Sequence, residues 1–304
     1  MNYKVEMCAD GTIRIGASDA AELFSFVQLS DSHLQVPRAD LPWTGERVEA
    51  MLEVVRRANA LQPDFIAFTG DMLDSFTPEN LGYIKDLFAR FKAPVYFVLG
   101  NHDPGIRSIA ALRNLVDLEA DFVAERERIG ALRRHNVEVP REASLKDDEC
   151  GMLQSSPCIS SYACRRWARA FELEDLSYSL EVAGFHLVFF NFDRAGIEED
   201  EMAWLEADIK KSRARPTLLF FHVPLPVEAL VAEIVGELGR DSCLAAGPNT
   251  ERLFSLLAEN PQIAAAFCGH VHFDSMHYYE NCAQITTAPV FTGACRRVVV
   301  RGPG

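Results

Sequence analysis

The chain has 304 residues, 48% of them hydrophobic, which is enough to build one substantial core. Its formal net charge of −14, unrelieved by any basic stripe, argues against long nucleic acid as a partner. No apolar stretch reaches the length of about 18 residues that marks a candidate membrane span, so none is expected. The first residues lack the basic and apolar regions of a signal peptide, and the cytoplasm is therefore the predicted location.

The N-terminal part of the chain alternates short apolar runs with segments of helical periodicity. Residues 4–7 and 12–15 flank an Asp-Gly pair and predict a β-hairpin. Three buried strands are predicted at residues 23–29, 65–69 and 95–99. Each of these runs is rich in aromatic or β-branched residues and is bounded by Pro, Gly or polar residues. Residues 46–60 and 78–91 repeat apolar side chains at helical spacing and predict helices.

The next segment, residues 104–175, is predicted to be an insertion within a single domain that spans residues 1–304. Helical spacing of leucine and phenylalanine predicts a long helix over residues 107–134, and an irregular loop or cap is expected over residues 136–164. Long functional loops commonly cover active sites, and this insertion could roof a substrate pocket. The eight cysteines of the chain are expected to be mostly free thiols, as is usual in cytosolic proteins.

Regular alternation returns in the second half of the chain. The sequence predicts strands at residues 176–182, 186–192, 217–221 and 264–268, helices at 198–211 and 249–259, and two β-like runs within 284–300. Alternating strands and helices favour an α/β fold. In such folds ligands gather outside the carboxyl ends of the strands, so the residues that follow each predicted strand are the first place to look for a site.

Metal-binding residue types follow five of the predicted strands directly. They stand in the blocks Asp31-x-His33, Gly70-Asp71, Gly100-Asn101-His102-Asp103, His222 and Gly269-His270-Val271-His272. Imidazole and carboxylate ligands suit borderline metals such as Mn, Fe and Zn. One carboxylate shared by two ions holds them about 3.5–4 Å apart, which suits in-line displacement at phosphorus. The set therefore predicts a binuclear metal centre.

Each of these residues, taken singly, also has an ordinary structural explanation. The carboxylates could cap a turn or a helix. An isolated histidine is more often a satisfied core residue than a metal ligand, and an asparagine after glycine can occupy a left-handed backbone position. The conjunction favours the metal centre, because the ordinary explanations require a separate accident at each of the five strand ends.

The order of the motifs, D-x-H, G-D, G-N-H-D, H and G-H-x-H, resembles that of the calcineurin-like metallophosphoesterases. The similarity extends from Phe24 to about Asp274 and is greatest to the branch that contains the class III cyclic-nucleotide phosphodiesterases. The resemblance implies a four-layer αββα sandwich, in which two mixed β-sheets are flanked by helices and a helical or loop insertion is added. The binuclear site would lie at one end of this sandwich.

The resemblance also implies a role for each site residue. The first metal would be held by Asp31, His33, Asp71 and His272. The second metal would be held by Asp71, Asn101, His222 and His270, so that Asp71 bridges the pair. His102 would lie outside the coordination sphere and face the substrate together with Asn101, and Asp74 would orient His102 by a hydrogen bond.

These roles predict a metal-dependent phosphoester hydrolase that acts on a small phosphodiester or phosphomonoester. Two Mn, Fe or Zn ions would supply a bridging hydroxide at neutral pH, and His102 would stabilise the transition state or protonate the leaving oxygen. Two alternatives remain open, a protein phosphatase and a catalytically silent scaffold of the same fold that binds a partner protein. The sequence also leaves a homo-oligomer open.

Overall fold

The computed structural model describes residues 3–105, 157–192, 196–238, 244–245, 247 and 249–303. The predicted helix over residues 107–134 lies outside the described residues, as does most of the predicted insertion over 104–175. The side chains of five cysteines are described, and these five are free thiols, in agreement with the prediction: Cys8, Cys164, Cys268, Cys282 and Cys295. Among the described helices, none is both long enough and apolar enough to cross a lipid bilayer.

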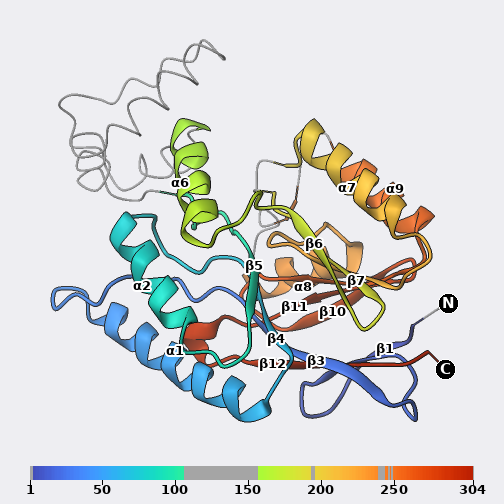
Figure 1. Cartoon of the computed structure of the whole chain (residues 1–304), viewed down its shortest axis with the longest axis horizontal. Helices are drawn as coiled ribbons and strands as arrows, with labels where there is room; N and C mark the ends of the chain where they lie inside the picture. The colour runs from blue at the N-terminus through green and yellow to red at the C-terminus, as the bar shows by residue number, and fades with distance from the viewer. Residues whose placement is uncertain are drawn as a thin grey trace.

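The first sheet contains six strands in the order β1-β2-β12-β3-β4-β5 (Figure 1). Their bounds are Val5–Met7 for β1, Ile13–Ile15 for β2, Glu22–Leu29 for β3, Phe65–Thr69 for β4, Val95–Val98 for β5 and Arg296–Arg301 for β12. β3, β4 and β5 are parallel, β12 runs antiparallel to β3, and β1 and β2 form the predicted hairpin. The sheet is therefore mixed.

The second sheet also has six strands, in the order β10-β11-β9-β8-β7-β6. Their bounds are Tyr178–Val182 for β6, Phe185–Phe189 for β7, Thr217–Phe220 for β8, Ile263–Cys268 for β9, Ser275–Tyr279 for β10 and Cys282–Thr286 for β11. The four central strands are parallel, and the two edge strands, β6 and β10, are antiparallel to their neighbours.

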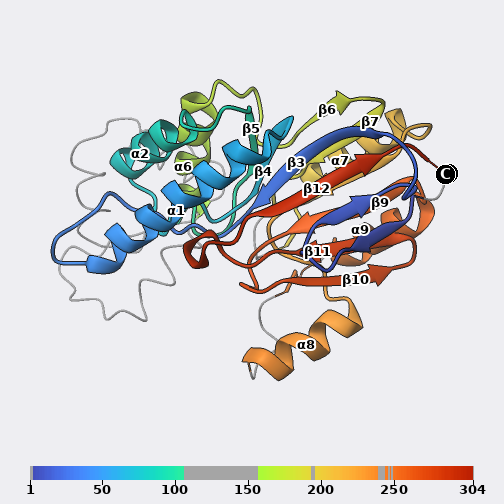
Figure 2. The ribbon, with the colours of Figure 1, turned by 90° about the horizontal axis from the view of Figure 1, so that it is seen from below.

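Helices cover the outer faces of both sheets. On the first sheet lie α1 (Pro42–Leu61), α2 (Pro78–Phe88) and α6 (Pro157–Ala170), and on the second lie α7 (Glu199–Lys211) and α9 (Thr250–Glu259). A sixth described helix, α8 (Glu228–Leu238), packs near β10 and stands apart from the others in Figure 2. A short 3₁₀ helix, η1 (Val290–Thr292), precedes β12 and packs on α1.

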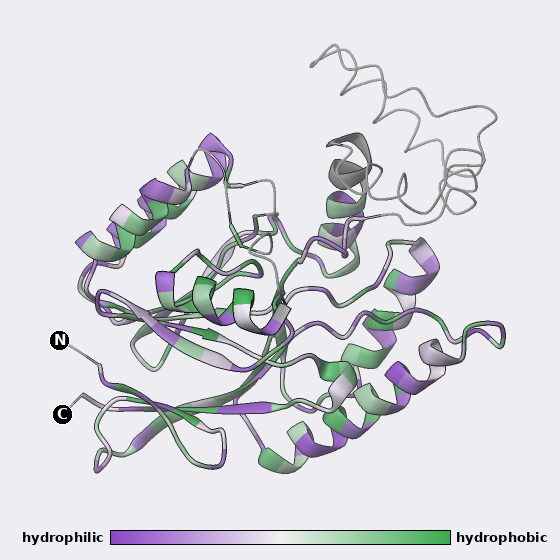
Figure 3. Cartoon of the chain, turned by 180° about the vertical axis from the view of Figure 1, so that it is seen from behind, coloured by the Kyte–Doolittle hydropathy of each residue, from purple (hydrophilic) through white to green (hydrophobic). Residues whose placement is uncertain are grey.

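Three buried apolar layers separate these elements, which confirms the predicted four-layer αββα sandwich. One layer lies between the first sheet and its helices, one between the sheets, and one between the second sheet and its helices. The middle layer is rich in phenylalanine: the rings of Phe26 and Phe65 stack at 4.8 Å, and those of Phe189 and Phe220 stack at 4.5 Å. Figure 3 shows apolar and polar residues alternating around the covering helices.

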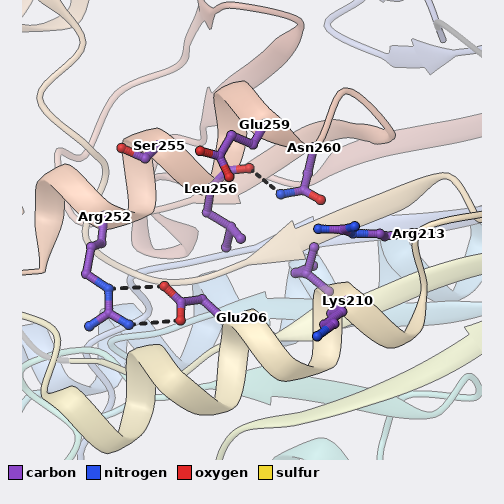
Figure 4. Close-up of a pocket in the computed structure, with 9 residues that line it drawn as sticks. Glu206, Lys210, Arg213, Arg252, Ser255, Leu256, Glu259 and Asn260 are labelled. Atoms are coloured by element: carbon purple, nitrogen blue, oxygen red, sulfur yellow. Dashed lines mark hydrogen bonds and ion pairs between the residues drawn. The ribbon is translucent and has the colours of Figure 1, made fainter.

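Two helices illustrate how local sequence sets their ends. Thr77 caps α2, because its side-chain oxygen accepts a hydrogen bond from the Asn80 N–H at 3.0 Å, and proline follows at the first helical position. α7 begins with acidic residues and ends with Lys210 and Lys211, an arrangement that complements the helix dipole. α7 also contacts α9 through Arg252, which donates to both carboxylate oxygens of Glu206 beside a surface pocket (Figure 4).

Three described elements, α6, β10 and α8, were not predicted from the sequence. The irregular loop expected up to residue 164 was wrong for residues 157–164, which form the first part of α6. β10 is an edge strand that contains His277 and two tyrosines, and only its first residue is fully buried, so it lacks the continuous apolar run of the central strands. β10 is therefore defined by its pairing with β11. α8 repeats apolar residues at helical spacing, with Leu230 and Ile234 buried and Val231 partly buried, so this signal was present in the sequence and was missed.

Candidate metal centre

The candidate residues all lie in loops at one edge of the two sheets. These loops follow β3, β4 and β5 of the first sheet and β8 and β9 of the second. Within the first sheet, the Asp31 N–H donates to the Gly70 carbonyl at 2.9 Å. Between the sheets, the His270 N–H donates to a carboxylate oxygen of Asp31 at 3.0 Å. The structure thus brings together the five blocks singled out in the sequence.

The backbone at this edge is unusual, because five site residues have a positive φ although none is glycine. These residues are Asp31, His33, Asp71, His270 and His272, with φ between 44° and 71°. Left-handed backbone is uncommon for such residues and costs about 1–3 kcal/mol each. It persists where surrounding contacts hold it. Here the hydrogen bonds between the loops do so, and one of them joins the His33 N–H to the Asp71 carbonyl at 3.0 Å.

A first cluster contains Asp31, His33 and His272, whose ligand atoms lie within 4.8 Å of one another. The Nε2 atom of His272 lies 3.2 Å from Oδ1 of Asp31 and 3.2 Å from Nε2 of His33. The His33 nitrogen is 3.7 Å from the same carboxylate oxygen. One carboxylate and two imidazole nitrogens therefore converge on one point, a donor set that suits a borderline divalent ion.

A second cluster contains Asp71, His222 and His270. Nε2 of His222 lies 3.2 Å from Oδ2 of Asp71 and 3.3 Å from Nδ1 of His270. Nδ1 of His222 lies 2.7 Å from the carbonyl oxygen of Thr69. A carbonyl can only accept, so Nδ1 carries the hydrogen of the neutral ring and Nε2 presents its lone pair to the cluster.

Asp71 lies between the two clusters. Its Oδ2 atom is 3.2 Å from Nε2 of His222 in the second cluster and 3.7 Å from Nε2 of His33 in the first. Its other oxygen, Oδ1, accepts a hydrogen bond from the backbone N–H of His102 at 2.8 Å. The carboxylate is therefore fixed by the loop after β5 while it faces both groups of potential ligands.

Asn101 contributes a polar atom that has no hydrogen-bond partner. Its side-chain oxygen is buried, and the described part of the chain offers it no donor. A buried acceptor without a partner costs about 1–3 kcal/mol. Coordination of a cation would remove that cost without adding negative charge, which fits the role implied for this residue.

The charges at the site favour a cation. Burial alone would raise the pKa of Asp71, but His222, His102 and His33 together outweigh burial and lower it. Burial alone would lower the pKa of His222, yet the charge and hydrogen bond of Asp71 raise it to about 9. The pKa of Asp31 is likewise lowered, because the hydrogen bonds of His272 and His33, together with the charges of His222 and His272, outweigh burial. Both carboxylates are therefore anionic at neutral pH and attract positive charge.

His102 and Asp74 lie together, in contact through the backbone of Asp74. The Nδ1 atom of His102 is 3.1 Å from the carbonyl oxygen of Asp74 and 3.9 Å from its carboxylate oxygen Oδ1. The carboxylate makes contacts of its own. It accepts a hydrogen bond from Gln35 at 2.9 Å, and its Oδ1 lies 3.7 Å from Nδ1 of His33.

Asp103 is a site residue to which the sequence analysis assigned no role. Its carboxylate accepts hydrogen bonds from the N–H groups of Leu73 and Gly100, both at 2.8 Å, and its carbonyl accepts one from the indole of Trp167 at 3.1 Å. Burial and the negative charge of Asp71 raise its pKa well above the usual range. Asp103 thus joins the loops after β4 and β5 and holds α6 against them. In the sequence, the only sign that Asp103 belongs to the site was its position at the end of the Gly-Asn-His-Asp block.

Two motif glycines are required by close approach. A Cβ atom at Gly100 would lie 2.2 Å from a carboxylate oxygen of Asp71. A Cβ atom at Gly269 would lie 1.8 Å from the hydroxyl of Ser30 and 2.5 Å from a carboxylate oxygen of Asp31. Any other residue would push the carboxylates out of the two clusters, so these glycines belong to the site as much as the residues they precede.

Comparisons with known proteins agree with this geometry. The family model described as calcineurin-like phosphoesterase matches residues 24–274. A probable glycerophosphodiester phosphodiesterase GpdQ from Arcobacter nitrofigilis is 23% identical to this chain, over 86% of the chain and 77% of the relative. The glycerophosphodiester phosphodiesterase GpdQ of Enterobacter lignolyticus is 24% identical, over 86% and 75%. The crystal structure of a dimetal phosphatase from Danio rerio shares the fold, with a TM-score of 0.52 and 13% identity over 89% of each chain.

Proposed function

The chain belongs to the calcineurin-like phosphoesterase family, and from this premise we propose that it hydrolyses small phosphodiesters at a two-metal centre. Membership makes it a metal-dependent phosphoester hydrolase. The observation that carries the finer proposal is the position of Asp71, whose carboxylate lies 3.2 Å from His222 of one cluster and 3.7 Å from His33 of the other. A carboxylate in that place can bind two ions at once.

The residues present fit such a pair of ions. We assign the first metal to Asp31, His33, Asp71 and His272, and the second to Asp71, Asn101, His222 and His270. Nitrogen and oxygen donors of this kind suit Mn, Fe or Zn. The unsatisfied oxygen of Asn101 supports its inclusion. The bond from His222 to the Thr69 carbonyl supports coordination through Nε2 of that histidine, because it fixes the tautomer.

The bound ions would supply a bridging hydroxide nucleophile at neutral pH and positive charge that stabilises the phosphorane-like transition state. Against two divalent ions, the carboxylates of Asp31 and Asp71 leave a net local charge of about +2, which favours an anionic phosphate. The chain's own contribution to bond cleavage is assigned to His102. The Nδ1–H group of His102 donates a hydrogen bond to the Asp74 carbonyl. A second proton on Nε2 would then be available to the departing oxygen.

A small diester is favoured over a polynucleotide because the net charge of −14 repels long anions. Salt screens that repulsion for a small substrate beyond about 8–10 Å. The two curated relatives are named as glycerophosphodiester phosphodiesterases. We therefore propose that a glycerophosphodiester, or a diester of similar size, is the preferred substrate.

The proposal is tested by stripping the protein with a chelator, restoring manganese, and assaying a panel of phosphate esters. The panel contains a chromogenic diester, a glycerophosphodiester, a phosphomonoester, a cyclic nucleotide and a phosphopeptide. We expect hydrolysis only with manganese, and faster hydrolysis of the linear diesters. Faster hydrolysis of the phosphopeptide would favour a protein phosphatase. The absence of hydrolysis of every ester with manganese restored would contradict the proposal.

A further inference from the structure

Arg47 of α1 lies against the first cluster, although it belongs to none of the metal-binding motifs. Its Nη1 atom donates a hydrogen bond to the carbonyl of His33 at 2.9 Å and lies 3.5 Å from Oδ1 of Asp74. Its guanidinium carbon is 4.4 Å from the ring centre of Trp43 and 4.9 Å from that of Phe291. These contacts come from the loops after β3 and β4, from α1 itself and from η1, and they hold the guanidinium beside the first cluster. The two aromatic faces favour a cation there.

The peptide that Arg47 contacts is one that requires support. His33 has a φ of 44°, and such a backbone persists only where its surroundings hold it. On one side the His33 N–H donates to the Asp71 carbonyl at 3.0 Å, and on the other the His33 carbonyl accepts from Arg47. Loss of the guanidinium would release one of these two constraints on the first cluster.

The carboxylate that Arg47 contacts also faces His33. Nε2 of His33 points toward Asp31 and His272, which leaves Nδ1 on the outer side of the cluster. That outer nitrogen lies 3.7 Å from Oδ1 of Asp74, the oxygen atom that Arg47 approaches. A metal-binding histidine commonly has a carboxylate or carbonyl beside its second nitrogen, where it orients the ring.

We propose that Arg47 is a positioning residue for the first metal, acting through the His33 peptide and the Asp74 carboxylate. This proposal rests on the two-metal function proposed above. The hydrogen bond to His33 and the approach to Asp74 place Arg47 beside the first cluster. The ring of Phe291, on which Arg47 rests, is likewise 5.5 Å from that of His272. We therefore expect Arg47 to affect one of the two metal affinities.

Arg57 provides a matched control on the same helix. It also connects α1 to the segment around η1, since it donates to the Gly293 carbonyl at 2.7 Å. Its exposed contact lies at the C-cap of η1 rather than at His33 or Asp74. Arg57→Met therefore removes a guanidinium and an α1–η1 contact without removing support from the first cluster.

The experiment is a manganese titration of the chelator-treated protein. Isothermal titration calorimetry measures the affinity of each site, and electron paramagnetic resonance reports whether the bound ions are coupled. The wild type and Arg57→Met should each bind two ions and give the spectrum of a magnetically coupled pair. Arg47→Met should retain one tight site and weaken the other by about 10–100-fold, the usual effect of removing an outer partner of a metal ligand. At one equivalent its spectrum should be that of isolated manganese. Arg47→Lys, which keeps a charge beside Asp74, should fall between the two.

The positioning role of Arg47 and the two-metal function can be overturned by different results. Wild-type affinities for both ions in Arg47→Met would overturn the positioning role. If that variant does not fold, wild-type affinities for both ions in Arg47→Lys would do the same. Binding of fewer than two ions by the wild-type protein would instead overturn the two-metal function, whatever the Arg47 variants do.

Discussion

Oδ2 of Asp71 lies 3.2 Å from Nε2 of His222, and this contact joins the two sheets at the candidate metal centre. Asp71 follows β4 of the first sheet, and His222 follows β8 of the second. The same histidine donates to the carbonyl of Thr69, the last residue of β4. The second cluster therefore exists only when the sheets are packed on each other, so metal binding and folding should be coupled.

Asp71→Asn should lower both the metal content and the turnover of a chromogenic phosphodiester. The substitution removes the negative charge from the proposed bridge while it keeps the size of the side chain. We expect metal affinity and turnover each to fall by at least about 10–100-fold, which is the usual effect of removing a residue that only supports a metal ligand. Elemental analysis and steady-state kinetics measure the two effects.

Asp64→Asn is the control for that variant. Asp64 stands just before β4, at the opposite end of the strand, and accepts a hydrogen bond from the Ser25 N–H at 2.7 Å. An amide oxygen can accept the same bond, so metal content should not change. Full metal content and normal turnover in Asp71→Asn would refute the bridging role.

His102→Ala should lower turnover by about 10²–10⁴-fold, the range for loss of a general acid, while both metals stay bound. Metal should be retained because the contact of this residue with Asp71 is made by its backbone N–H, which alanine keeps. Manganese stoichiometry and turnover number, measured on the same sample, separate the two effects. An unchanged rate would mean that His102 has no part in departure of the leaving group.

The raised pKa of His222 predicts how the metal-stripped protein responds to pH. A folded-state pKa of about 9, against an ordinary value of 6.5, means that protonation of His222 favours the folded protein. This contribution is complete below pH 6.5 and is lost as the pH rises through about 9. Bound metal replaces the proton, so metal binding should release protons, and activity should rise from about pH 6 toward 8.

Thermal unfolding of stripped and manganese-loaded protein at pH 6 and pH 9 checks this sign. The stripped protein should lose stability between the two pH values, and the gain from manganese should be larger at pH 9. Activity and metal content that held steady down to about pH 4 would contradict the role of histidine ligands.

The strands and the loops that carry the candidate ligands were predictable from sequence, for a simple physical reason. Central strands of a parallel sheet are buried on both faces and therefore appear as continuous apolar runs, such as residues 65–69 and 217–221. Their carboxyl ends gather ligand-binding loops, so a polar block after each run marks the site. The side-chain distances within the clusters depend on packing between the sheets, which no local pattern encodes.

Arg47, Trp43 and Phe291 show where such prediction stops. The two residues of α1 lie more than two hundred positions from η1 in the sequence, yet the guanidinium packs on both rings. Read locally, Arg47 is an ordinary polar residue of an amphipathic helix. Its significance depends on how α1 and η1 pack beside β3, and this is a tertiary relationship. Asp103 is similar, because its partners are backbone N–H groups of two separate loops.

Substitution of Gly269 by alanine should damage the metal centre, whereas the same change at Gly82 should not. At Gly269 the added methyl group would lie 1.8 Å from the Ser30 hydroxyl and 2.5 Å from a carboxylate oxygen of Asp31, so one of the proposed ligands must move. At Gly82, inside α2, nothing lies within 4 Å of the added atom. Alanine is the better helix former there by about 0.5–1 kcal/mol.

We therefore expect Gly269→Ala to bind less manganese and to unfold at lower urea concentration than the wild type. Gly82→Ala should bind two ions and unfold at equal or higher urea concentration. Because both variants add one methyl group, a difference between them reports the space around the carboxylate and not the loss of glycine flexibility. If Gly269→Ala bound manganese as tightly as Gly82→Ala, the close approach of Gly269 to Asp31 would not be needed for the metal centre.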